Sequence, residues 1–190
     1  DVNPDGSKIQ QEDFASLAGV TADNAGKNYK YDSKSYEDIA SLIRKHIPAW
    51  RVELIKFYRL MLFNFLFANG DAHLKNFSVL MTPEGDYVLS PAYDLINTLV
   101  HLPSDPIFAL QRGLFSTPSD NQGPVTGKMF HEFGIRIGLP EKTVKKELDK
   151  FCAEYADIDK LIENSYLPDK LKKTYRLIYR TRLVSYLQGR

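Results

Sequence analysis

Three residues in the middle of the chain have the types and spacing to handle a magnesium-bound phosphate. Asp71 and Asn76 stand five residues apart in the stretch NGDAHLKNFSVL, and Asp94 follows in LSPAYDLINT. A carboxylate and an amide oxygen suit a hard cation such as Mg²⁺, which keeps waters and takes phosphate oxygens. With Asn76 and Asp94 as ligands, Asp71 can accept a hydrogen bond from an attacking hydroxyl. The pattern therefore predicts phosphoryl transfer, in which positioning and charge do most of the work.

A buried helix and a β-hairpin are expected to bring these groups together. The mostly apolar segment 50–68 has helical periodicity. Asn69 and Gly70 follow it, and glycine suits the left-handed position after a helix. The runs FSVLM and YVLS, joined by the turn residues 83–86, predict two strands. Because a hairpin brings its two ends together, the three polar residues should converge at one end.

The rest of the chain is predicted to be mostly helical. Ser35 followed by Asp38 resembles a capping box at the start of a helix. Segments 21–32 and 103–127 are expected to be loops, the second a long surface connection. Further helices are expected over 11–20, 128–137, 140–164 and 168–187. The fold class is therefore mainly α with a small β-hairpin, without an alternating βαβ pattern.

The amino-acid composition is that of a globular protein with almost no net charge, and therefore without a strong overall electrostatic field. The 190 residues are 43% hydrophobic and 26% charged, with a formal net charge of +1 at pH 7. This balance predicts no bulk attraction to nucleic acid or to a membrane surface. The apolar stretch 57–67 is too short to cross a bilayer. A single cysteine, Cys152, rules out an internal disulfide and is typical of a reducing, cytoplasmic setting.

The two motifs together resemble one family of kinases. NGDAHLKNFSVL followed by LSPAYDLINT is similar to the catalytic and metal-binding motifs of HipA-like bacterial serine/threonine kinases, the toxins of HipB–HipA type toxin–antitoxin modules. QQEDFASLAGV and KYDSKSYEDIASLI are also similar to the family, although Gln10 stands where it more often has histidine. The resemblance covers roughly residues 8–98. It implies one kinase-like C-terminal lobe over 1–190, with a catalytic loop at 69–78, a metal-binding motif at 90–96 and a helical remainder at 128–187.

The resemblance assigns roles to individual residues. It implies that Asp71 is the catalytic base and that Asn76 and Asp94 bind Mg²⁺ and ATP. His73 stands where eukaryotic-type kinases place a lysine that touches the transferring phosphate, and its imidazole could stabilise charge there. Lys75 either reaches phosphate or points to solvent. The further candidates near the nucleotide are Gln11 and Tyr93.

The sequence departs from a complete kinase. It contains neither a glycine-rich phosphate-covering loop nor a strand lysine like that of Val-Ala-Ile-Lys. The opening DVNPDGSK is interpreted as a cut. We therefore expect an N-terminal lobe to be missing or to lie on another chain, and residues 1–190 alone to be inactive or nearly so.

Other interpretations remain open at this point. Asp71, Asn76 and Asp94 could simply cap turns. The chain could be a lipid or small-molecule phosphotransferase with a related catalytic loop, or a non-catalytic lobe that binds an antitoxin or DNA. For a HipA-type kinase the resemblance implies a protein substrate in translation, such as an aminoacyl-tRNA synthetase, and a HipB-like antitoxin, with DNA reached only through that antitoxin. The last helix is basic, which indicates either a solvated face or phosphate contacts; its cations are Lys170, Lys172, Lys173, Arg176, Arg180 and Arg182.

Overall fold

The computed structural model describes residues 2, 6–153 and 155–189. The chain divides into two compact units. The first consists of residues 1–58, 72–94 and 109–122, and the second of residues 59–71, 95–108 and 123–190. No helix in the described part is both long enough and apolar enough to cross a membrane. Residues 1 and 3–5 of the opening segment, interpreted above as a cut, lie outside the described residues.

The first unit contains a three-stranded antiparallel sheet. The predicted hairpin is confirmed as β2 (Ser78–Met81) and β3 (Tyr87–Leu89), with Leu80 opposite Val88. A strand that the sequence analysis missed, β1 (Gln11–Asp13), pairs with the other side of β2, so the order is β1-β2-β3. The predicted helix over 11–20 is therefore wrong in its first turn. The helix there, α1, covers only Phe14–Leu17.

Three further helices belong to the first unit. The predicted loop 21–32 contains two short helices, α2 (Ala22–Ala25) and α3 (Tyr29–Asp32). α4 (Tyr36–His46) begins with the predicted capping box, in which the backbone amide of Asp38 donates to Ser35 Oγ at 3.1 Å and Ser35 N donates to the Asp38 carboxylate at 2.8 Å. Burial would raise the pKa of Asp38, but hydrogen bonds from Ser35 and Ser116 lower it below the usual value.

The core of the first unit explains why these short elements hold together. The ring of Phe77 packs edge-on against Phe57 at 5.6 Å and against Tyr36 at 6.1 Å between ring centroids. The segment expected to be a long surface connection contributes Leu114 and Phe115, both buried. That expectation is therefore wrong for residues 109–115, because their apolar side chains complete this core. A 3₁₀ turn, η3 (Pro118–Asn121), follows.

α5 (Trp50–Leu66) is the predicted apolar helix. The left-handed residue after it is Ala68, with a φ of 56°, and not Gly70 as expected. Gly70 is required for space instead: a Cβ there would lie 2.8 Å from the carbonyl oxygen of Pro106 and would overlap the carboxylate of Asp105. The glycine thus allows close backbone approach rather than a special dihedral angle.

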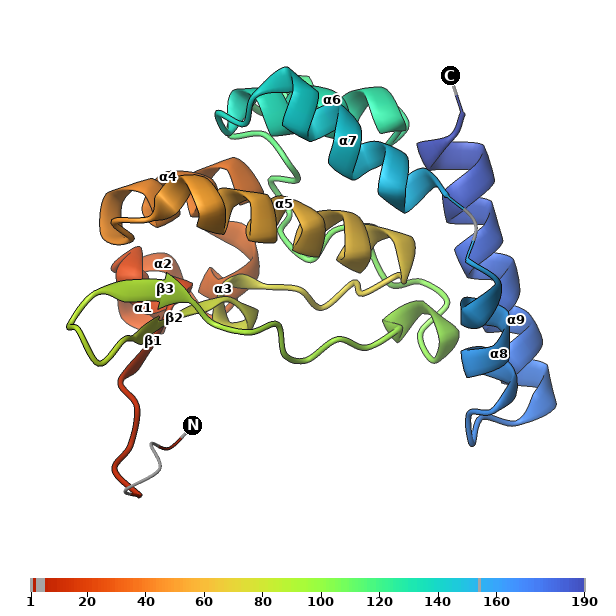
Figure 1. The fold of residues 1–190 in the computed structure, drawn as a ribbon, viewed down its shortest axis with the longest axis horizontal. Coiled ribbons are helices and arrows are strands. Elements are labelled where there is room, and N and C mark those ends of the chain that lie inside the picture. Colours follow the sequence, from red (N-terminus) through yellow and green to blue (C-terminus); the bar gives the residue numbers. More distant parts are fainter. Residues whose placement is uncertain (1, 3–5, 154, 190) are drawn as a thin grey trace. The chain divides into compact units, whose positions relative to one another are not determined.

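Helices make up most of the second unit (Figure 1). α6 (Gly127–Arg136) matches the prediction, and it packs beside α7 (Glu141–Cys152). The single helix expected over 140–164 is wrong, since Ala153 is extended and α8 (Ala156–Glu163) is a separate helix. Part of this break, residue 154, lies outside the described residues. α9 (Asp169–Thr181) continues into a π-helical turn, η4 (Arg182–Leu187).

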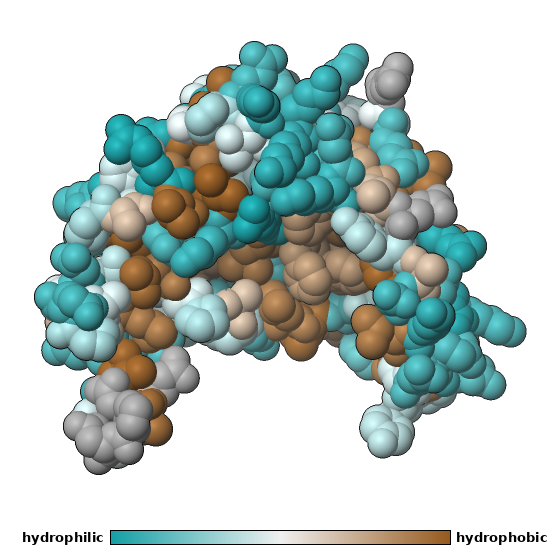
Figure 2. Space-filling view, viewed as in Figure 1, coloured by the Kyte–Doolittle hydropathy of each residue, from teal (hydrophilic) through white to brown (hydrophobic). Residues whose placement is uncertain are grey.

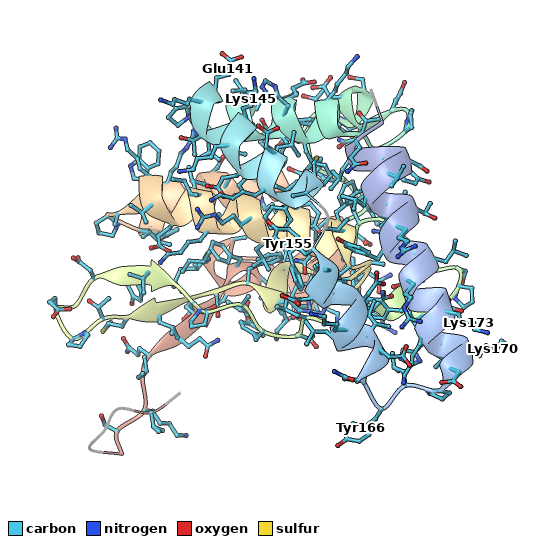
Figure 3. The ribbon with its side chains drawn as sticks, turned by 45° about the vertical axis from the view of Figure 1, so that its right-hand side comes forward. Glu141, Lys145, Tyr155, Tyr166, Lys170 and Lys173 are labelled. Atoms are coloured by element: carbon cyan, nitrogen blue, oxygen red, sulfur yellow. The ribbon has the colours of Figure 1, made fainter. Side chains whose placement is uncertain are left out.

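The cations of the last helix are mostly engaged within the second unit. Arg180 pairs with Asp159 at 2.9 Å, Arg176 pairs with Asp159 and Glu163, and Arg182 is buried and donates to the carbonyl of Phe65 at 2.6 Å. Lys170 and Lys173 project from the start of α9 (Figure 3). Hydrophilic residues dominate the visible face around the lower end of α8 and α9 (Figure 2). A solvated, ion-paired face is therefore the better interpretation of this helix.

A buried ion pair ties α7 to α5 in the second unit. Glu147 is 3% exposed, and its carboxylate accepts two hydrogen bonds from the half-exposed Arg59 guanidinium at 2.8 and 2.9 Å and one from Lys150 at 3.1 Å. The hydrogen bonds from Arg59 lower the pKa of Glu147 from 4.5 to about 2. Because the folded pKa lies below the unfolded one, the pair contributes stability above pH 4.5 and loses it as the pH falls toward 2.

We predict that Glu147→Gln lowers the free energy of unfolding by about 2 kcal/mol at pH 7, less than the full pKa shift implies because Arg59 is half-exposed. The difference from the wild type should shrink steadily between pH 4.5 and pH 3. Urea denaturation followed by circular dichroism at pH 7 and pH 3 measures both values. Glu141→Gln, an exposed glutamate on the same helix (Figure 3), is the matched control. An equal deficit for Glu147→Gln at both pH values would show that the loss is not electrostatic.

Candidate active site

The hairpin brings two of the three predicted residues into contact. Asn76 ends a 3₁₀ turn, η1 (Leu74–Asn76), immediately before β2, and Asp94 follows β3. The amide nitrogen of Asn76 donates to Asp94 Oδ2 at 2.8 Å. The strand pairing extends beyond β3 through a hydrogen bond from Ser90 N to the carbonyl of Ser78 at 2.8 Å. The two residues expected to hold the metal therefore lie side by side, although 18 positions separate them.

Asp94 has an unusual backbone. Its φ is 55°, and only Ala68 shares a positive φ among the non-glycine residues that the structure describes. Aspartate tolerates this left-handed conformation better than most residues, yet it still costs free energy. The side chain is exposed, whereas Asn76 is 9% exposed. Such local strain at an exposed carboxylate is typical of functional sites, where surrounding structure holds a side chain in a set direction.

The remaining nucleotide candidates gather around the same end of the sheet. Gln11 donates to the hydroxyl of Ser78 at 2.7 Å, and the hydroxyl of Tyr93 donates to the carbonyl of Lys75 at 2.8 Å. Burial raises the pKa of Tyr93 above its ordinary value, and the negative charges of Asp13 and Asp94 add to the rise while hydrogen bonds oppose it. Tyr93 is thus a neutral, anchored ring beside Asp94.

Lys75 has one loosely held partner. Its ammonium lies 3.7 Å from the carboxylate of Asp13, and both side chains are partly exposed. Asp13 is itself the N-cap of α1, where it accepts from the backbone amide of Ser16 at 2.9 Å. A partly exposed pair at this distance contributes little stability, so Lys75 can exchange Asp13 for another anion at small cost.

His73 is buried, and a lysine that the sequence analysis missed lies against it. His73 is 6% exposed, and its Nε2 is 3.0 Å from the ammonium of Lys30 on α3. An ammonium at Lys30 can only donate, so opposite it Nε2 is the acceptor and the imidazole is neutral. The ring of Tyr31 packs edge-on against the imidazole at 5.0 Å. Both residues lie in stretches quoted above as similar to the family, KYDSKSYEDIASLI and NGDAHLKNFSVL, but neither stretch alone indicates that the two side chains meet.

Asp71 belongs to the second unit, where hydrogen bonds hold its backbone amide and that of Gly70. These are bonds on its N-terminal side: its amide donates to the side-chain oxygen of Asn69 at 3.2 Å, and the amide of Gly70 donates to Thr98 Oγ1 at 2.9 Å. Asn69 in turn donates to Asn64 on α5 at 3.1 Å. Thr98 and Asn64 are supporting residues that the sequence analysis did not find. The convergence of the Asp71 carboxylate with Asn76 and Asp94 stays a prediction.

The donor set fits magnesium that is shared with a substrate. Within the described residues no group of three or more His, Cys, Asp or Glu side chains is arranged to hold a metal by itself. One carboxylate and one amide, side by side, instead suit an ion that completes its octahedron with waters and phosphate oxygens. The hydrogen bond from the Asn76 nitrogen leaves the carbonyl oxygen as the atom of that amide suited to a metal.

Comparison with known families agrees with these motifs. The sequence model of the HipA-like C-terminal domain matches residues 1–158. The chain belongs to the HipA-like C-terminal domain family. The match extends well beyond the motifs and includes α6 and α7, where the sequence analysis found no family-specific motif.

Curated relatives of this HipA-like domain carry kinase names. The chain is 34% identical over 110 residues to "Putative kinase Y4dM" of Sinorhizobium fredii, which covers 58% of this chain and 25% of that protein. It is 28% identical over 160 residues to "Putative kinase" of Haemophilus influenzae, with 75% of this chain and 46% of that protein covered. The chain thus spans between a quarter and half of the length of these relatives.

Solved structures show the same fold. HipA in a complex of the Shewanella oneidensis toxin–antitoxin system with HipB and operator DNA superimposes with a TM-score of 0.69 at 19% identity, covering 95% of this chain and 44% of that one. The Helicobacter pylori proinflammatory kinase CtkA superimposes with a TM-score of 0.54 at 15% identity, covering 97% and 70%. The predicted fold class, a mainly helical kinase-like C-terminal lobe, is confirmed.

Proposed function

We propose that this chain is the catalytic lobe of an ATP-dependent serine/threonine protein kinase of HipA type. The observation that carries the proposal is the contact between Asn76 and Asp94, directly after the loop that contains Asp71. A capping role explains neither the strained backbone of Asp94 nor the pairing of an amide with a carboxylate at the end of a hairpin. Kinase-named relatives and two structural neighbours support the same assignment.

Each residue then has a distinct task. Asn76 and Asp94 hold Mg²⁺, which would neutralise phosphate charge and orient the triphosphate of ATP. Asp71 accepts the hydrogen bond of a seryl or threonyl hydroxyl, which points the oxygen at the terminal phosphorus and takes up its proton as the new oxygen–phosphorus bond forms and ADP departs. Tyr93, Gln11 and Lys75 line the nucleotide site.

The lobe does not contain every part that phosphoryl transfer uses. No glycine-rich loop or strand lysine occurs in the printed sequence. Transfer depends almost entirely on positioning and charge stabilisation, so we propose that full activity needs an N-terminal lobe in the same protein or on another chain. The protein in its encoded length is therefore the proper material for every activity measurement below.

Partners are proposed from the structural neighbour and from the surface. Because the Shewanella HipA structure also contains HipB and operator DNA, we propose a HipB-like antitoxin as partner and DNA contact only through it. The ion pairs on α9 agree with this, since Arg176 and Arg180 are already bound to carboxylates. We propose a cytoplasmic protein substrate such as an aminoacyl-tRNA synthetase, as the family resemblance implies.

The acceptor class can be decided in one assay. Labelled ATP is offered to the protein in its encoded length together with serine- and threonine-containing proteins, phosphatidylinositol or an aminoglycoside. We expect label only on protein, as phosphoserine or phosphothreonine, and only when Mg²⁺ is present. Label on the lipid or the aminoglycoside but not on protein would replace the proposed function with the small-molecule alternative.

A further inference from the structure

Lys30 places a positive charge beside the proposed catalytic loop. Its ammonium is 3.0 Å from Nε2 of His73 and 4.8 Å from the centroid of the Tyr31 ring. We propose that Lys30 is a phosphate-binding residue of the nucleotide site and that His73 is the positioning residue that holds it. The inference rests on the proposed kinase function and adds to it the cation that contacts the terminal phosphate of ATP.

The partners of Lys30 leave its charge uncompensated. Both groups around the ammonium, a neutral imidazole and an aromatic ring, carry no net charge, and Lys30 forms no ion pair with any carboxylate in the described part of the chain. The side chain is only partly exposed. A partly exposed cation whose contacts are with neutral groups is available to pair with an anion. In a site for MgATP, the phosphate chain supplies that anion.

The position of Lys30 suits the terminal phosphate. His73 directly precedes η1, and the amide of Asn76 at the other end of this turn donates to the carbonyl of His73 at 2.9 Å. Three 3₁₀ residues rise about 6 Å. His73, which contacts the ammonium, and Asn76, which contacts Asp94, thus stand at the two ends of one short turn, a backbone separation that a single polyphosphate chain can span.

The contact also explains what His73 does. A histidine that is 6% exposed and turns Nε2 toward a lysine is poorly placed to meet substrate itself. Its edge-on contact with Tyr31 holds α3 against the loop, and the hydrogen bond from Gln111 N to the carbonyl of Tyr31 at 3.0 Å ties α3 to the segment 109–115. Eukaryotic-type kinases have a lysine two residues after the base, at the position of His73. Here the corresponding positive charge is that of Lys30 on α3.

The test compares two nucleotides on Lys30→Met in the encoded-length protein. If Lys30 contacts the terminal phosphate, the variant should bind the non-hydrolysable ATP analogue AMP-PNP with Mg²⁺ about tenfold more weakly, while its affinity for ADP with Mg²⁺ stays within twofold of the wild type. Transfer should fall by about 100-fold in kcat, the usual loss for one charge-stabilising donor. Isothermal titration calorimetry and the labelled transfer assay give these values.

Two matched variants complete the design. Lys27→Met removes an exposed lysine three residues away and should change neither affinity nor turnover. Lys30→Arg keeps the charge and should recover part of the preference for AMP-PNP over ADP. If His73 acts only through Lys30, the double variant His73→Asn/Lys30→Met should lose no more turnover than Lys30→Met alone.

The outcomes separate this inference from the proposed function. A wild-type protein that transfers phosphate while Lys30→Met keeps normal turnover, or loses AMP-PNP and ADP affinity equally, would overturn the role of Lys30 and leave the kinase assignment intact. A wild-type protein with neither MgATP binding nor transfer would remove both. Thermal unfolding of each variant shows whether a loss of affinity or turnover reflects misfolding. If Lys30→Met misfolds, Lys30→Arg decides whether the positive charge at position 30 favours AMP-PNP over ADP.

Discussion

Asp71→Asn is expected to abolish protein phosphorylation while leaving the fold intact. The substitution keeps the size of the side chain but removes the carboxylate that accepts the hydroxyl proton, and we expect kcat to fall about 10³-fold or more. The backbone should not move, because the amide of residue 71 is held by Asn69 and its neighbour Gly70 by Thr98. MgATP affinity should stay within about threefold of the wild type, since Asp71 acts on the acceptor. Steady-state transfer and nucleotide titration measure the two effects.

Asp86→Asn is the matched control for that experiment. Asp86 is an exposed aspartate in the turn between β2 and β3, where its backbone oxygen accepts from Thr82 N at 2.7 Å and its side chain has no hydrogen bond or ion pair with any described residue. It should phosphorylate substrate at the wild-type rate. An Asp71→Asn protein that retains near-native turnover would exclude Asp71 as the base and, with it, the proposed mechanism.

Asp94→Asn is expected to remove the magnesium dependence of nucleotide binding. Asparagine also tolerates the left-handed φ of 55° and can still accept from the nitrogen of Asn76, so the variant isolates the charge from the backbone. We expect affinity for ATP in the presence of Mg²⁺ to fall about 100-fold, at the upper end of losses seen for residues that support a metal site. Affinity for ATP without Mg²⁺ should stay close to that of the wild type.

Calorimetric titration with and without Mg²⁺ separates these cases. Asp94→Ala is a useful companion, because alanine at a positive φ adds backbone strain and should lower the unfolding temperature as well. If Asp94→Asn binds MgATP as tightly as the wild type, the carboxylate is no metal ligand and the strained backbone needs another explanation.

The elements that the sequence predicted well are those whose own residues determine them. α4 begins with a hydroxyl and an acid that cap each other, and α5 is a long apolar helix whatever surrounds it. The hairpin follows from its turn residues, and it carries Asn76 to Asp94 without any further information. This is why the contact between Asn76 and Asp94 could be predicted from one sequence, while their role as metal ligands stays a prediction.

The features that were missed depend on distant parts of the chain. β1 has only three residues, and they form a strand because β2 offers them a partner. α7 ends just before Ala153, and Ala68 has a left-handed backbone, but neither position holds the glycine or proline that would indicate such a feature in a sequence. Lys30 lies 43 positions before His73, in a segment without helical or strand periodicity. Only the folded structure therefore shows that its ammonium lies beside His73.

A structure of the encoded-length protein with AMP-PNP and Mn²⁺ in place of Mg²⁺ tests the central claim most directly, because the anomalous signal locates the metal. We expect the ion roughly 2.0–2.3 Å from Asp94 and Asn76 oxygens and bound to phosphate, with the Asp71 carboxylate facing the terminal phosphate within about 6 Å. A metal bound elsewhere, or an Asp71 carboxylate more than about 10 Å from the phosphate, would contradict the kinase assignment.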